Sequence, residues 1–114
     1  MRFNICKIEP INYLHSKCFD DFSRLLCFGI IDSGYKCTLS SNKLDSNCIN
    51  IVMGTHLLSQ KDIVYLNNSV NMKEIIYLNT EQLKYTNNQW LSTILSIGNK
   101  NKVLWDYSKS NINY

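Results

Sequence analysis

The chain of 114 residues contains little of what divides, anchors or exports a protein. It has one proline and four glycines, so no proline- or glycine-rich linker separates two domains, and its length favours one domain over residues 1–114. No apolar run approaches the roughly 20 residues of a membrane span. The opening MRFNICKIEPIN lacks the continuous apolar segment of a signal peptide. We therefore expect a cytoplasmic protein without a transmembrane segment.

A pairing pattern among the cysteines is also missing. The five cysteines, Cys6, Cys18, Cys27, Cys37 and Cys48, are odd in number and form no Cys-x-x-Cys pair. This argues against a disulfide framework and against a zinc site, so we expect no metal in this chain. Several of them stand among apolar residues and are interpreted as small buried side chains. Such usage suits a reducing compartment.

Charge is not concentrated in one region. The formal net charge is +3, and the lysines are scattered apart from a loose group at Lys100, Lys102 and Lys109. A solvated surface accounts for this pattern. It is too weak to indicate binding to DNA or RNA, so we expect no nucleic-acid partner.

The apolar residues that are present indicate a folded α/β chain. They make up 45% of the sequence, against 18% charged residues, which is a globular composition. RFNICKIE (2–9) alternates apolar and polar residues and predicts a first strand, ended by Pro10. CINIVMG (48–54) and KEIIYLN (73–79) are nearly continuous apolar runs. Such runs are typical of strands buried on both faces, which belong to parallel sheets.

Residues 20–35, DDFSRLLCFGIIDSGY, predict a helix. Two acidic residues, Asp20 and Asp21, suit its positive N-terminal end, and Gly34 suits a left-handed C-terminal cap. Apolar residues at helical spacing are expected to form its buried face. They are Phe22, Leu25, Leu26 and Ile30.

The remaining elements complete an alternating order. YKCTLS (35–40) and KVLWDYS (102–108) predict two more strands, and WLSTILSIG (90–98) predicts a helix. Residues 57–73 fit either a short helix or an irregular crossing. The alternation predicts a doubly wound, mainly parallel α/β sheet, a Rossmann-like half of about five strands with flanking helices.

Three of the predicted strands end in polar residues. These polar residues are Gly54, Thr55 and His56 after the strand at 48–53, then Asn79, Thr80, Glu81 and Gln82, and finally Asp106, Tyr107 and Ser108. Open parallel sheets bind ligands beyond the carboxyl ends of their strands, so these residues predict a ligand crevice.

Each of these groups also has a purely structural interpretation. Gly54 can serve a tight turn alone, and the two residues after it can satisfy backbone groups at the strand end. Glu81 can begin a helix or lie on the surface, and Asp106 and Ser108 can cap the next element. Both tryptophans can belong to the core.

Several nucleotide-binding motifs are absent. No glycine follows the first strand in IEPINYLHSKCF, which argues against a nicotinamide or flavin dehydrogenase. The chain also has no phosphate-binding Gly-x-x-x-x-Gly-Lys-Ser/Thr loop, no Gly-x-Ser-x-Gly elbow and no Asp-x-Asp pair.

Four segments in order resemble the N-terminal domain of bacterial glycosyltransferase-like proteins of the GT-B architecture. They are DSGYKCTLS (32–40), NIVMGTHLL (50–58), IIYLNTEQL (75–83) and VLWDYSKSNI (103–112). The order and spacing hold over about residues 15–112. GTHLL and WDYSKSNI are the most distinctive pieces.

The resemblance implies a role in bacterial polysaccharide biosynthesis. The N-terminal half of GT-B enzymes mainly holds a glycan or lipid-linked acceptor, and the C-terminal half mainly holds the nucleotide-sugar donor, usually without a bound metal. His56 or Glu81 is then the candidate for activating an acceptor hydroxyl or steadying charge. The residues implied to line the cleft beside them are Gly54, Thr55, Gln82, Asp106, Tyr107, Ser108 and Asn111.

The sequence departs from the family because a donor-binding half is not among these 114 residues. Transfer needs two substrates held in register, so we expect the chain alone to be inactive. We also expect an exposed apolar face near residues 103–105, covered by the missing donor half or by another protein chain. The alternative hypothesis is a non-catalytic binding or interaction module with the same fold, such as a truncated remnant, a regulator or an immunity-type protein.

Overall fold

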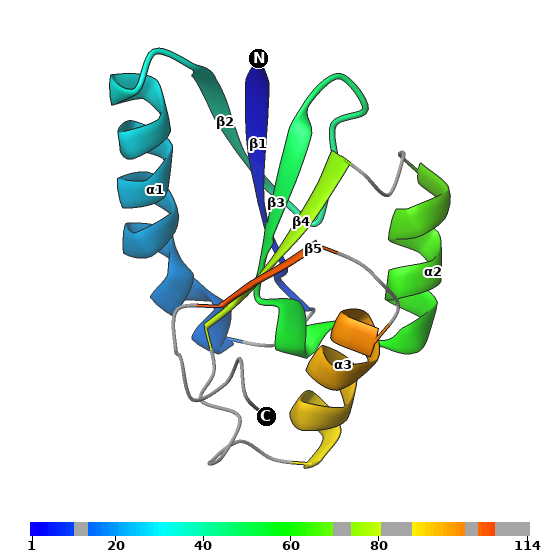
Figure 1. Ribbon diagram of the computed structural model, residues 1–114. Helices are drawn as coiled ribbons and strands as arrows, with labels where there is room; N and C mark the ends of the chain where they lie inside the picture. Colours follow the sequence, from blue (N-terminus) through cyan, green and yellow to red (C-terminus); the bar gives the residue numbers. More distant parts are fainter. Residues whose placement is uncertain (11–13, 70–73, 81–87, 100–102, 107–114) are drawn as a thin grey trace.

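The computed structural model describes residues 1–10, 14–69, 74–80, 88–99 and 103–106. These ranges contain five strands and three α-helices in alternation (Figure 1). In chain order the elements are β1 (Arg2–Lys7), η1 (Leu14–Phe19), α1 (Asp20–Asp32), β2 (Lys36–Ser41), β3 (Ile49–Met53), η2 (Thr55–Leu57), α2 (Gln60–Ser69), β4 (Ile75–Asn79), α3 (Asn88–Asn99) and β5 (Val103–Asp106).

All five strands are parallel and stand in the order β2-β1-β3-β4-β5. Strand β2 lies on one side of β1, and β3, β4 and β5 follow in order on the other side. Right-handed crossovers therefore place α1 on one face of the sheet and α2 and α3 on the opposite face (Figure 1). The predicted fold, a doubly wound α/β sheet of Rossmann-like type, is confirmed.

The central strand β3 is buried on both faces, as its apolar run predicts. Its alternate side chains enter two separate cores. Ile51 and Met53 pack with Ile5, Phe19 and Cys27 under α1. Val52 instead packs on the other face, where the core contains Cys6, Ile8, Leu58, Ile63, Leu66, Ile75, Tyr77 and Ile97.

The prediction for the buried face of α1 is only partly right. Leu26 and Ile30 pack against the core, but Phe22 is 47% exposed and Leu25 is 70% exposed. The residues that turn fully inward are Ser23 and Cys27. Their small side chains let the helix approach the sheet closely, and the Ser23 hydroxyl donates to the carbonyl of Asp20 at 2.9 Å, so its burial leaves no polar group unsatisfied.

The end of α1 confirms the prediction for Gly34. Gly34 has φ +93°, its N–H donates to the carbonyl of Ile31 at 2.9 Å, and the N–H of Tyr35 donates to the carbonyl of Ile30 at 3.2 Å. These two bonds form a Schellman motif, which satisfies carbonyls that the helix would leave open.

The segment at 57–73 forms a helix, α2, over its middle part. The Asp62 N–H donates to the Ser59 hydroxyl at 3.1 Å, and the Ser59 N–H donates to the Asp62 carboxylate at 2.9 Å. This reciprocal cap fixes the start of the helix. In the described residues no helix has both the length and the hydropathy needed to cross a membrane.

The cysteines are all unpaired. Cys6, Cys27 and Cys48 are buried, as predicted for small hydrophobic side chains, whereas Cys18 is exposed. Burial raises the pKa of the Cys6 thiol, which keeps it protonated and unreactive.

Candidate functional site

The turn after β3 is built around Gly54. Its φ is +86°, and a Cβ added there would lie 3.3 Å from the Cβ of Ile8 and 3.5 Å from Cε2 of Phe19. The left-handed backbone and the close neighbours both require glycine. The structural interpretation of Gly54 is therefore sufficient, and its backbone brings η2 tightly against the end of β1.

Thr55 is fully buried and joins two strand ends. Its hydroxyl donates to the carbonyl of Leu78 at 2.9 Å, with the carbonyl of Val52 at 3.2 Å also within reach. The predicted binding residue thus satisfies backbone carbonyls of β3 and β4. This contact fixes the position of η2 relative to β4.

His56 lies between two aromatic rings and is 3% exposed. The imidazole centroid is 4.5 Å from that of Trp90 on α3 and 6.0 Å from that of Phe19, both in edge-on geometry. Burial lowers the pKa of His56 to about 4. The imidazole is therefore neutral near pH 7 and is a weak proton acceptor, because an effective general base has a pKa near the working pH.

The ends of β4 and β5 meet through a side-chain hydrogen bond. The Asn79 Nδ2 donates to Oδ2 of Asp106 at 2.7 Å, and the register pairs the same two residues. Asp106 thus lies at the same sheet edge as Gly54, Thr55 and His56, as the parallel strands require. Thr80, the residue that follows β4, has a buried hydroxyl oxygen with no hydrogen-bond partner among the described residues.

Five of the predicted site residues lie outside the described residues. They are Glu81, Gln82, Tyr107, Ser108 and Asn111. The part of the site that the structure describes therefore consists of the end of β3, the end of β4 and Asp106.

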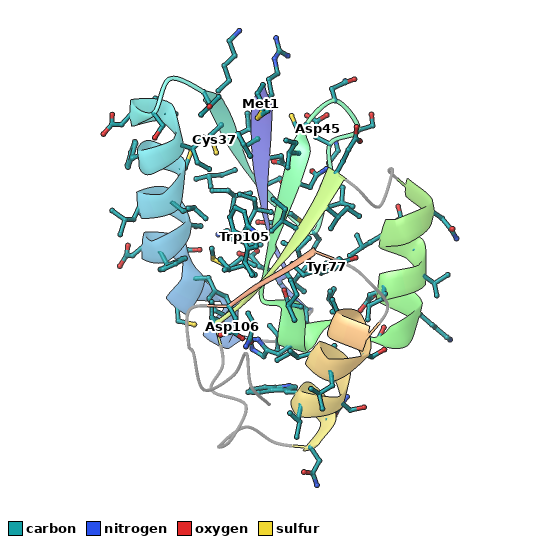
Figure 2. All side chains as sticks on the ribbon, viewed as in Figure 1. Met1, Cys37, Asp45, Tyr77, Trp105 and Asp106 are labelled. Carbon is teal, nitrogen blue, oxygen red and sulfur yellow. The ribbon has the colours of Figure 1, made fainter. Side chains whose placement is uncertain are left out.

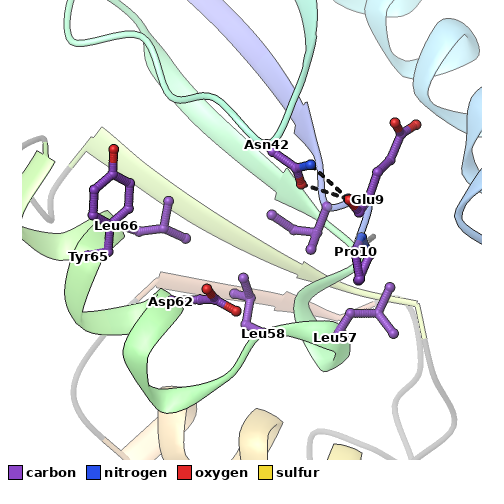
Figure 3. A pocket seen from close by; sticks show the side chains of 9 residues that line it. Glu9, Pro10, Asn42, Leu57, Leu58, Asp62, Tyr65 and Leu66 are labelled. Carbon is purple, nitrogen blue, oxygen red and sulfur yellow. Dashed lines mark hydrogen bonds between the residues drawn. The ribbon is translucent and has the colours of Figure 1, made fainter. Parts of the chain in front are cut away.

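An open crevice lies beside these residues at the carboxyl ends of β1 and β3 (Figure 3). Its volume is about 310 Å³. Between these two strands the chain reverses its direction across the sheet, which is the switch point where ligands of doubly wound sheets bind. The residues that line it are Ile8, Glu9, Pro10, Asn42, Leu57, Leu58, Asp62, Tyr65 and Leu66.

A clamp between two loops forms one wall of the crevice. The Asn42 side chain accepts from the Glu9 N–H at 2.7 Å and donates to the Glu9 carbonyl at 2.8 Å (Figure 3). Asn42 itself has φ +55°, a conformation that asparagine tolerates better than most residues. The opposite wall belongs to α2 and presents the Asp62 carboxylate and the exposed ring of Tyr65.

Lys7 provides the positive charge next to this crevice. Its ammonium group pairs with Glu9 at 3.1 Å and with Asp20 at the start of α1. The hydrogen bond to Asp20 is the largest cause that raises the pKa of Lys7, and the same bond lowers the pKa of Asp20. The Glu9 carboxylate is therefore held by this cation and points away from the other crevice residues, so Asp62 supplies the carboxylate that faces the crevice (Figure 3).

The sequence interpretation missed the crevice residues Glu9, Asn42, Asp62 and Tyr65. One signal was available, because SQKD at 59–62 is a capping pattern that places Asp62 in the first turn of a helix after β3. The Glu9–Asn42 clamp joins residues 33 positions apart, and nothing local indicates it.

A carboxylate, an aromatic ring and apolar side chains in one open crevice suit a neutral ligand that carries hydroxyl groups. Carboxylate oxygens accept hydrogen bonds from hydroxyls, and a tyrosine ring packs on the apolar face of a ring compound. Among the described residues no group of three or more His, Cys, Asp or Glu side chains could hold a metal ion.

The fold and this edge define a doubly wound parallel α/β domain with a crevice at its switch point. In comparisons with known proteins, the chain matched no family model, no curated protein and no solved structure.

Proposed function

We propose that the chain is the acceptor-side domain of a GT-B-type glycosyltransferase and forms one wall of its transfer cleft. The observation that carries this proposal is the crevice at the switch point of the sheet, which adjoins the predicted strand-end residues. The ordered resemblance over residues 15–112 suggests the reaction class. The nucleotide-sugar donor would bind to a second half that these residues do not contain.

The crevice chemistry supports a sugar-like acceptor. Asp62 offers a carboxylate oxygen to hydroxyl donors, and Tyr65 offers a ring for stacking. No lysine or arginine lines the crevice among the described residues, so a diphosphate would lack the cationic partners that phosphates usually bind. This composition fits a neutral glycan or the sugar of a lipid-linked acceptor better than a nucleotide sugar.

The two predicted catalytic residues have different parts in this proposal. His56 is buried and has a pKa of about 4, so its neutral imidazole suits hydrogen bonding and packing rather than stabilisation of a negative charge. Glu81 therefore takes the role of accepting the proton from an acceptor hydroxyl.

Binding to the isolated chain tests the proposal without requiring transfer. The isotopically labelled protein is titrated with N-acetylglucosamine, with maltose and with UDP-glucose, and backbone amides are followed by NMR. We expect weak saccharide binding with shifts at Leu57, Leu58 and Asp62. UDP-glucose should bind no more tightly than a free sugar.

Two tyrosine variants provide the matched control. Tyr65→Ala removes the exposed ring in the crevice, whereas Tyr35→Ala removes an exposed ring at the end of α1. Only the first should abolish the shifts. Diphosphate-dependent tight binding, shifts at another surface, or the absence of any saccharide effect would each count against an acceptor-side role.

A non-catalytic interaction module is the second candidate function. It is favoured by the exposed apolar surface around Trp105, which is 45% exposed, and by the structural roles of Gly54 and Thr55. A chain that ignores every saccharide but forms a stable protein complex would support this candidate.

A further inference from the structure

One face of the sheet has an apolar groove beside α1. Its volume is about 550 Å³. The floor is formed by Phe3, Ile51 and Trp105, and one wall is the flank of α1 around Gly29. The register places Trp105 in the same row as Leu78 and Met53, on the α1 side. Tyr77 and Trp105, both labelled in Figure 2, therefore lie on opposite faces of the sheet.

A ridge of exposed apolar side chains runs along α1 next to this groove. The ridge consists of Phe22, Leu25, Phe28 and Ile31, which are 47%, 70%, 63% and 46% exposed. Their spacing of three residues is one of the rows by which helices interlock with a neighbouring surface. Glycine at position 29 is unfavourable inside a helix. An added Cβ there would touch nothing within 4 Å, so this flank of α1 is open to an approaching helix.

We propose that the ridge and the groove form a two-fold interface between two copies of this chain. The ridge of each copy enters the groove of the other copy. Two-fold symmetry repeats this contact, so both ridges and both grooves are buried. The sheets then enclose a shared layer that holds the two α1 helices.

The exposed apolar area is of the size that a homodimer needs. The exposed parts of the four ridge residues, Tyr35 and Trp105 amount to roughly 600 Å², if each side chain carries about 150–250 Å². A standard interface buries about 800 Å² per partner, and homodimer interfaces are about 65% apolar. The apolar share of such an interface, roughly 500 Å², matches the surface available here.

The dipole of α1 favours an antiparallel pair. A two-fold axis perpendicular to the helix makes the two copies of α1 antiparallel. The positive end of each helix dipole then lies beside the negative end of its neighbour.

The interface lies on the sheet face, whereas the crevice lies at the strand ends. The two proposals are therefore independent, because loss of the dimer leaves Glu9, Asp62 and Tyr65 in place.

The mass of the full chain in solution tests the interface. By light scattering coupled to size exclusion, the chain at micromolar concentration should have twice its monomer mass of 13.3 kDa. Leu25→Glu should weaken the dimer by about tenfold or more. Val64→Glu, at a residue on α2 that is 58% exposed, is the matched control and should leave the dimer unchanged.

Gly29→Leu separates a specific interface from general stickiness. Leucine adds apolar surface and is a better helix former than glycine, so nonspecific association would increase. In the proposed interface the new side chain fills the groove, and the protein should become a well-folded monomer by circular dichroism. A wild-type monomer, heterogeneous aggregates, or a dimer that tolerates both Leu25→Glu and Gly29→Leu would overturn the proposal.

Discussion

The two faces of the sheet are covered to different extents. On the α2/α3 face, Ile63, Leu66 and Ile97 pack onto Val52 and Tyr77 and close the core. On the α1 face a single helix covers the core around Ile5 and Ile51, and an open groove remains beside it. The same strands thus supply one closed face and one partly open face.

The closed face supplies most of the core that folds the chain, and the open face is the surface that we propose for contact between two copies. Strands of parallel sheets are usually buried on both faces, and β3 to β5 carry apolar residues on both. The open face keeps Trp105 and the α1 ridge exposed. A second surface that covers these side chains would remove their apolar area from water.

The largest expected effect is a core deletion on the closed face. Ile97→Ala, at a fully buried position on α3, should lower the free energy of unfolding by about 3 kcal/mol, because it removes buried methylenes and leaves a cavity. Leu25→Ala on the open face should change it by less than about 0.5 kcal/mol in the monomer. Urea denaturation at low protein concentration measures both. Equal losses would show that the two faces contribute alike to folding.

The second prediction concerns His56, which lies where the two faces meet. Its pKa is about 4 in the folded chain and 6.5 ordinarily. Between these values the unfolded chain binds a proton that the folded chain does not, so stability falls as pH falls from about 6.5 to about 4. The loss is at most about 3 kcal/mol.

Two histidine variants isolate this pH dependence. Denaturation curves of His56→Phe should lose most of the slope between pH 4 and pH 6.5, since phenylalanine keeps the ring but cannot titrate. His15→Gln changes the only other histidine and serves as the control. If the slope persists in His56→Phe, then His56 is not the group responsible.

The fold was predictable because its signals are local. The apolar runs at 48–54 and 73–79 marked β3 and β4, and Asp20, Asp21 and Gly34 marked the ends of α1. The convergence of polar residues at one sheet edge followed from parallel strands alone. The Asn79–Asp106 hydrogen bond is an example of that convergence.

The missed features depend on packing between distant segments. Hydropathy favoured Phe22 and Leu25 as buried, but the helix turns the small Ser23 and Cys27 towards the sheet. Ser23 satisfies its hydroxyl within the helix, which a hydropathy pattern cannot show. The crevice walls likewise depend on the contact between Asn42 and Glu9, which belongs to the tertiary structure.

The third prediction compares two glycines in left-handed conformations. Gly54→Ala should cost about 2–3 kcal/mol, because a positive φ costs an L-residue about 1–2 kcal/mol and the new methyl group would crowd Ile8 at 3.3 Å. Gly34→Ala has the same backbone penalty but open space around it, so it should cost about 1–2 kcal/mol. Thermal unfolding of both variants gives the difference. A smaller loss at Gly54 than at Gly34 would contradict the tight contact between η2 and the end of β1.

The smallest effect should appear at Gly29 on the open face, and its sign depends on the state of the chain. In the dilute monomer Gly29→Ala should raise the free energy of unfolding by up to about 1 kcal/mol, because alanine is the better helix former and nothing lies within 4 Å of its methyl group. In the proposed dimer the same methyl group stands in the groove and should weaken association. A variant that is more stable yet less dimeric would show that this position is selected for contact rather than for folding. If stability and association both rise, the groove does not receive a closely packed ridge, and the proposed interface is wrong.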